Sequence, residues 1–251
     1  MRAVFAPTVK ASGEYAFFNR ASGLLGYNFT EFQIDENMVK DMGISYENTP
    51  SGIEERSFDF IRDALGSYAV DVSLIDIVVR VVHAGADFSL ANLIEASEGA
   101  LDAARSSLSR GGVIYCDVEM LKSGISRREC ARLKLTPRSY IHDEEVRAAS
   151  ERLGVTRAMA SVDRALEDGV RIFAFGNAPT ALFRLLERVG EGSSVDFVCG
   201  MPVGFVGAAD SKAMLAESGI PSIIMKGPRG GSGLCAACLN AILRGVRPRE
   251  E

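Results

Sequence analysis

One apolar stretch of the chain carries an arginine together with one of only two histidines. The stretch runs from Val78 to Gly85, and its two polar side chains are Arg80 and His83. Residues three apart on an α-helix lie on the same face, so these two side chains would project together. A guanidinium can hold an anion, and an imidazole can carry a proton near neutral pH. The spacing therefore indicates an anion site beside a proton carrier; a histidine buried and satisfied within the core would fit the same residues.

Three glycine-rich turns in the final third of the chain offer a second kind of chemistry. Each follows a short apolar run and precedes a helical pattern, and together they span residues 176–180, 200–207 and 226–233. Turns that open onto helix N-termini present backbone N–H groups and a positive dipole end to an anion. Three converging turns would suit a ligand with several carboxylates or phosphates. Glycines that only permit tight strand-to-helix turns would explain any one of these turns equally well.

Other kinds of site have little support. Neither the GxxxxGK[ST] nor the GxGxxG spacing of nucleotide-binding loops occurs, and a serine hydrolase would need a GxSxG elbow that is missing. Two widely separated histidines, His83 and His142, do not make a zinc site, and we expect neither a metal nor a cofactor. His142 lies next to acidic residues and is interpreted as a surface residue. Cys235 to Cys238 match CxxC, but their small neighbours favour a packed helix.

The elements that must position these residues alternate regularly in the final third. We predict strands at 171–175, 196–199 and 222–225, each followed by a helix, at 181–189, 209–217 and 234–243. This alternation predicts βαβ units and a parallel sheet with helices on both faces. The expected fold is therefore α/β, a three-layer α/β/α arrangement with a mostly parallel, Rossmann-like sheet. In such folds, ligands bind beyond the carboxyl ends of the strands, where the glycine-rich turns lie.

The middle of the chain is predicted with less regularity. Helical periodicity begins at Ile53, and further helices are expected at about 74–82, ended by Gly85, and at 98–109. A nearly continuous apolar run at 113–120 predicts a buried strand. The polar residues 122–143 give no clear element, and a long helix follows at 144–166, with a break expected at Gly154.

Composition limits the remaining possibilities. The chain has 251 residues, of which 47% are hydrophobic and 24% charged, which suits one α/β domain with an appendage. We assign residues 1–50 to an N-terminal extension of unknown role and 51–251 to the main domain. A net charge of −5 argues against a nucleic-acid partner. No apolar run is long enough for a membrane span, and five cysteines, an odd number, favour reduced thiols, so a cytoplasmic protein is expected.

Several motifs, read together, resemble the precorrin-8X methylmutase family, which includes the cobalt-precorrin-8 methylmutases. The resemblance runs in unbroken order from about residue 50 to 245. It rests most strongly on GNAPTALF and GMPVGFVGAA, at 176–183 and 200–209. Shorter matches support it at Glu55–Phe58, Val79–Ala84, Cys116–Met120, Val155–Arg157 and Arg229–Ser232. The first 50 residues are additional to the family pattern, and the segment from Cys130 to His142 is hard to align.

The resemblance implies an isomerase of cobalamin biosynthesis. Such an enzyme moves a methyl group from C-11 to C-12 of the corrinoid ring, giving hydrogenobyrinate or, with cobalt inserted, cobyrinate. Family members are homodimers with active sites near the subunit interface. The family's catalytic histidine falls on His83, and its substrate contacts fall on Ser57, Arg80 and Arg157. Cobalt belongs to the ring and needs no protein motif, so the sequence fits either substrate.

The residues fit this chemistry on their own terms. A concerted methyl shift needs no nucleophile or redox group, and it gains from protonation of the conjugated ring by a histidine. The substrate carries many carboxylates, which Arg80 and Arg157 could hold. A non-catalytic corrinoid-binding or carrier protein remains the alternative, which the retention of His83 disfavours. A generic nucleotide-binding α/β protein is a more distant alternative, disfavoured by the missing fingerprints.

Overall fold

The computed structural model describes residues 8–9, 15–16 and 48–248. The chain divides into two compact units, residues 1–48 and 49–251. In the first unit, β1 (Thr8–Val9) pairs antiparallel with β2 (Tyr15–Ala16). The second unit contains the predicted α/β domain.

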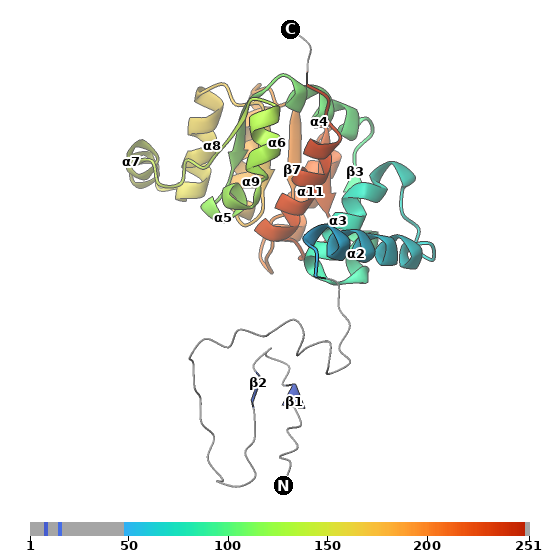
Figure 1. Ribbon diagram of the computed structural model, residues 1–251. Helices are drawn as coiled ribbons and strands as arrows, with labels where there is room; N and C mark the ends of the chain where they lie inside the picture. The colour runs from blue at the N-terminus through green and yellow to red at the C-terminus, as the bar shows by residue number, and fades with distance from the viewer. Residues whose placement is uncertain (1–7, 10–14, 17–47, 249–251) are drawn as a thin grey trace, which may run out of the picture. The chain divides into compact units, whose positions relative to one another are not determined.

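A six-stranded sheet forms the centre of the second unit (Figure 1). Its strand order is β3-β8-β7-β6-β4-β5, and every neighbouring pair is parallel except β3 with β8. The strands are β3 (Ile94–Ala96), β4 (Gly112–Cys116), β5 (Leu135–Arg138), β6 (Ile172–Phe175), β7 (Phe197–Gly200) and β8 (Ser222–Met225). Each residue of β6, β7 and β8 is buried, as expected for strands covered on both faces. The predicted mostly parallel sheet is confirmed.

Two hydrophobic cores, one on each face of the sheet, make the fold three-layered. Successive strand residues point to opposite faces, so Ile172 and Ala174 pack into one core while Phe173 and Phe175 pack into the other. The helices of the first face are α2 (Pro50–Leu65), α3 (Ile75–Gly85), α4 (Ala100–Ser109), α5 (Glu119–Gly124), α6 (Arg127–Arg132) and α11 (Ser232–Arg244). Those of the second face are α7 (Glu144–Leu153), α8 (Arg157–Glu167), α9 (Pro179–Gly190) and α10 (Ala208–Glu217).

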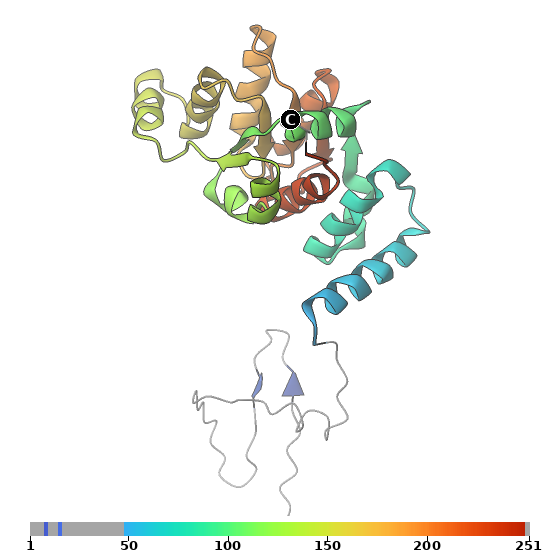
Figure 2. The ribbon, with the colours of Figure 1, turned by 45° about the horizontal axis from the view of Figure 1, so that its top comes forward.

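The helices spread toward two ends of the domain. α2 and α3 lie side by side at one end, and α7 and α8 lie at the other, as the views in Figures 1 and 2 agree. Two short 3-10 helices, η1 (Val72–Leu74) and η2 (Phe88–Leu93), flank α3. This separation decides which of the predicted site residues can meet within one chain.

One predicted boundary is confirmed and several others differ from the structure. The predicted break at Gly154 is confirmed, since that residue ends α7 in the left-handed conformation with φ 65°. The strand predicted at 113–120 ends at Cys116, and α5 begins three residues later. The polar residues 122–143 contain α6 and β5, which lacks an apolar pattern because it is an edge strand with a proline. The short edge strand β3 was also not predicted.

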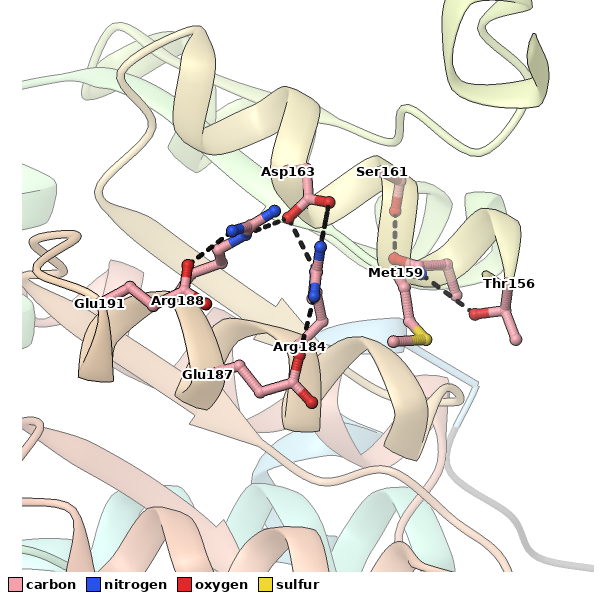
Figure 3. A network of polar contacts seen from close by, with 9 residues as sticks. Thr156, Met159, Ser161, Asp163, Arg184, Glu187, Arg188 and Glu191 are labelled. Carbon is pink, nitrogen blue, oxygen red and sulfur yellow. Dashed lines mark hydrogen bonds and ion pairs between the residues drawn. The ribbon is translucent and has the colours of Figure 1, made fainter. Parts of the chain in front are cut away.

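A charged network joins α8 to α9 on the second face. Figure 3 shows Asp163 of α8 between Arg184 and Arg188 of α9. Arg184 Nε lies 2.9 Å and Arg188 Nε 2.7 Å from Asp163 Oδ1. Burial raises the pKa of Asp163, but hydrogen bonds from Arg188 and Arg184 outweigh it, and the net pKa is lowered. The carboxylate is therefore held ionised between the two helices.

Candidate functional site

The phenyl ring of Phe58, on α2, contacts both members of the predicted Arg80 and His83 pair. The His83 ring lies edge-on to it, with centroids 5.1 Å apart. The Arg80 guanidinium carbon lies 4.6 Å from the centroid of the same phenyl ring. Arg80 and His83 therefore project from one face of α3 toward α2, as their spacing predicted.

His83 lies in the last turn of α3 and is exposed. Its interpretation as a buried core histidine is therefore wrong. The helix ends because Ala86 adopts a left-handed conformation (φ 47°) and donates its N–H to the carbonyls of His83 and Val82. Gly85 packs so tightly on Leu90 that a side-chain carbon there would collide with it.

The end of α3 lies at the carboxyl edge of the parallel strands. The same hypothetical carbon on Gly85 would lie 3.4 Å from Leu234, in the first turn of α11. Because α11 follows the loop that leaves β8, its first turn marks the edge where ligands bind in open α/β sheets. His83 thus stands at the edge of the sheet where a ligand is expected.

Arg80 is half-buried and pairs with a carboxylate of its own chain. Its Nη1 lies 3.1 Å from Glu54 Oε1, and Arg244 Nη1 lies 3.7 Å from the same oxygen. Arg80 also lines a cavity of about 250 Å³ with Arg62, Arg105 and Arg244. Asp76 lines the same cavity and pairs with Arg62 at 2.8 Å, so the arginines outnumber the carboxylates there and the cavity is locally basic in a protein of net charge −5. Such a cavity favours a ligand with carboxylates.

The other two predicted contacts occupy different places. Ser57 precedes Phe58 on α2 and donates its hydroxyl to the Ile53 carbonyl oxygen at 2.7 Å, which leaves the hydroxyl oxygen able to accept. Arg157 begins α8, at the opposite end of the domain from α3, and is exposed. The structure therefore groups Ser57, Arg80 and His83 on two packed helices and leaves Arg157 apart from them.

A buried carboxylate that sequence reasoning missed organises the first glycine-rich turn. Asp117 accepts hydrogen bonds from the backbone N–H groups of Gly176, Asn177 and Ala178, at 3.1, 2.7 and 2.7 Å. Burial raises the pKa of Asp117, and these donors oppose the rise. Because the donors are satisfied by the protein, they are not free for a substrate anion, contrary to our expectation for this turn. The only signal in the sequence is an aspartate directly after the buried strand β4.

The other two turns are joined to one another through their backbones. Gly204 N donates to Pro228 O at 3.0 Å, and Gly231 N donates to Met201 O at 2.9 Å. Gly230 packs directly on the Met201 and Pro202 backbone, where no side chain would fit. The tip of the second turn is left uncovered: Phe205 is 100% exposed and Val206 89%. The turns therefore form one framework that presents apolar side chains at the carboxyl edge.

The remaining candidates behave as structural residues. His142 is exposed, as predicted. All five cysteines are free and buried, and burial raises the pKa of the Cys235 thiol on α11, so the CxxC match is part of a packed helix. Within residues 48–248, no group of three or more His, Cys, Asp or Glu side chains is arranged to hold a metal ion. No helix of the described part of the chain is long and apolar enough to cross a membrane.

Comparison with known proteins identifies a single family. The precorrin-8X methylmutase family matches residues 52–245. The cobalt-precorrin-8 methylmutase of Salmonella typhimurium is 41% identical over 209 residues, covering 80% of this chain and 98% of that protein. The precorrin-8X methylmutase of Pseudomonas aeruginosa is 36% identical and covers 79% and 97% of the two chains. A solved structure of the Thermus thermophilus precorrin-8X methylmutase superposes with a TM-score of 0.73 at 33% identity, covering 78% of this chain and 98% of that one.

Proposed function

Since this chain belongs to the precorrin-8X methylmutase family, we propose that it moves a methyl group from C-11 to C-12 of a corrinoid ring, with His83 as the proton donor and acceptor. The observation that carries the proposal is the placement of His83: exposed, at the carboxyl edge of the sheet, beside Arg80 on a shared phenyl ring. The catalytic domain comprises residues 51–251.

His83 supplies a proton to the reaction rather than a covalent bond. In a 1,5-sigmatropic shift, the bond from the methyl carbon to C-11 breaks as the bond to C-12 forms, so no external group is added or lost. Protonation of a ring nitrogen by His83 withdraws electrons from the conjugated system and lowers the barrier. The proton returns to His83 once the methyl group has moved, which restores the enzyme. A histidine suits this task because its charge changes near neutral pH.

Arg80 holds one of the substrate's carboxylates beside His83. The cavity it lines contains three further guanidinium groups for neighbouring acidic side chains of the ring, of which Arg62 is already paired with Asp76. Glu54, which bridges Arg80 and Arg244, occupies the position of a carboxylate partner and would give way to the substrate. Ser57, one residue before Phe58, accepts or donates a hydrogen bond to the substrate at the same end of the domain as Arg80.

Arg157 takes part from a second subunit. Its helix, α8, lies at the opposite end of the domain from α3, which carries His83 and Arg80 (Figures 1 and 2), so we do not expect Arg157 to reach a ligand that Arg80 holds in the same chain. In a homodimer, α8 of one subunit would lie near α3 of the other, and each site would contain residues of both. Mixing inactive H83A and R157A proteins would then restore part of the activity, because a mixed dimer contains one intact site.

One assay tests the activity itself. The protein is incubated with precorrin-8X and, separately, with cobalt-precorrin-8, and the absorption spectrum is followed. Spectral conversion of excess substrate to hydrogenobyrinate or cobyrinate supports a methylmutase and shows which ring is used. A stoichiometric shift without conversion would instead indicate a corrinoid-binding or carrier protein. The H142A variant, altered at the other histidine, serves as the control for H83A in the same assay.

A further inference from the structure

Arg229, in the loop between β8 and α11, reaches across to the segment that follows α3. Its Nη2 lies 2.6 Å from Asp87 Oδ2, and its Nη1 lies 2.5 Å from Ser89 Oγ. These partners are 142 and 140 residues away in the sequence. A guanidinium group that binds one partner through each of its two terminal nitrogens restrains both the distances and the angles of these contacts.

Asp87 and Ser89 belong to the turn that ends the helix carrying His83. Asp87 lies four residues after His83, and its backbone N–H donates to the Val82 carbonyl at 3.4 Å. Its Oδ1 accepts the Ser89 backbone N–H at 2.8 Å, which caps η2, while Oδ2 is taken by Arg229. Both oxygens of the Asp87 carboxylate are therefore bound, and they hold in place the segment that follows α3, directly after the left-handed Ala86.

The backbone of Arg229 is itself anchored from the second face of the sheet. Lys212 on α10 is buried, with 1% of its surface exposed, and its Nζ donates to the Arg229 carbonyl oxygen at 2.6 Å. The adjoining Gly230 sits directly on the Met201 and Pro202 backbone. A rigid chain of contacts thus runs from α10 through Arg229 to the last turn of α3.

From these contacts we infer that Arg229 is a positioning residue for His83. By binding Asp87 and Ser89 it holds the turn after α3, a contact that we call the clamp, and so fixes the position of the His83 imidazole at the carboxyl edge. The effect of the clamp on turnover rests on the proposed function, but its effect on the position of the His83 side chain does not. The last turn of a helix frays most readily, so a clamp just beyond it acts where displacement would be easiest. A small displacement of a proton donor slows catalysis strongly.

The test compares R229Q with the matched control R171Q. Arg171 also forms an ion pair with an aspartate, at 2.8 Å from Asp196, and is equally exposed, at 51% against 49% for Arg229, but it lies at the amino edge of the sheet. We expect R229Q to lower kcat by about tenfold or more, with KM changed by less than about twofold because Arg229 is not proposed to touch substrate. R229K keeps the charge but has a single ammonium group in place of the two guanidinium contacts, so it should restore only part of the loss, and R171Q should leave both constants unchanged.

A second measurement is independent of turnover. The chain has only two histidines, so in an H142Q background the imidazole NMR signals of the full-length protein report His83 alone. We expect these signals to shift or broaden in R229Q and to stay in place in R171Q. If wild-type protein converts neither corrinoid, the proposed function fails while this spectrum still decides the positioning role.

Unchanged kcat and unchanged His83 signals in R229Q would overturn the inference, as would equal losses in R229Q and R171Q, which would mark a general stabilising role. If R229Q does not fold, S89A removes one of the two partners while the arginine remains. S89A should then show a smaller decrease in kcat and smaller shifts of the His83 signals, and wild-type values of both in S89A would refute the clamp.

Discussion

The phenyl ring of Phe58 meets the imidazole of His83 edge-on, with ring centroids 5.1 Å apart and planes inclined at 85°. The same ring lies under the Arg80 guanidinium. One aromatic side chain from α2 therefore sets the orientation of two functional groups on α3. Phe58, which is neither titratable nor charged, is therefore part of the site.

Phe58→Leu should loosen both groups at once. Leucine keeps an apolar contact but has no π face or ring edge, so we expect the free energy of unfolding to fall by about 1–2 kcal/mol. Turnover should fall by roughly three- to tenfold as His83 gains freedom. Denaturant unfolding and steady-state kinetics check both values. Phe60→Leu is the control, since Phe60 is on the same helix, largely exposed, and contacts Phe88 instead; equal kinetic losses in the two variants would contradict the role of Phe58.

His83→Ala should abolish turnover and spare binding. Removal of the proton donor costs about 10²–10⁴-fold in rate, whereas the carboxylate contacts through Arg80 remain. Turnover and a spectral titration with the corrinoid product measure the two effects separately. Full activity in this variant would remove His83 from the mechanism, and the loss of binding together with turnover would assign it a binding role.

Arg80→Ala should weaken binding of the corrinoid by roughly 1.5–3 kcal/mol, the usual worth of a charged hydrogen bond. The free energy of unfolding should change by less than about 1 kcal/mol, because the pair with Glu54 is partly exposed. Glu54→Gln is the reciprocal variant: it removes the competing carboxylate and should leave affinity equal or higher. Unchanged affinity in Arg80→Ala, measured by spectral titration, would contradict the proposed carboxylate contact.

Local and long-range relations differ in how far the sequence predicts them. Short apolar runs followed by glycine-rich turns were enough to predict β6, β7 and β8, and the i, i+3 spacing of Arg80 and His83 was enough to place both on one face. The contacts that complete the site join residues far apart in the chain: Phe58 to His83, Asp117 to Gly176, and Arg229 to Asp87. No periodicity encodes such pairs, so only the folded chain reveals them. β5 was missed for another reason, since an edge strand with Pro137 carries no apolar pattern.

Asp117→Asn should destabilise the fold around the first glycine-rich turn. The wild-type carboxylate accepts three backbone N–H groups, whereas an asparagine would turn its own NH₂ toward at least one of them. A buried donor left without an acceptor costs about 1–3 kcal/mol, whereas loss of a buried charge, whose pKa burial raises, offsets part of that cost. We expect a decrease of about 1–2 kcal/mol in the free energy of unfolding by denaturant titration. A change below about 0.5 kcal/mol would show that the three donors find other acceptors.

Because of the network of Asp163 with Arg184 and Arg188 (Figure 3), part of the free energy of unfolding should be lost at acid pH. The pKa of Asp163 is lowered in the folded protein, so folding favours the ionised form. Its contribution is therefore fully present above the pKa of an unfolded aspartate, about 4, and is lost as the pH falls through the lower folded value. At pH 7, Asp163→Asn should cost about 1–3 kcal/mol, and the gap between variant and wild type should narrow steadily below about pH 4. Denaturant unfolding between pH 7 and pH 2.5 measures this gap, and Asp210→Asn, on the exposed surface of α10, is the control for loss of a carboxylate outside the network. A gap that stayed constant with pH would mean that Asp163 contributes through packing and neutral hydrogen bonds, and not through its charge.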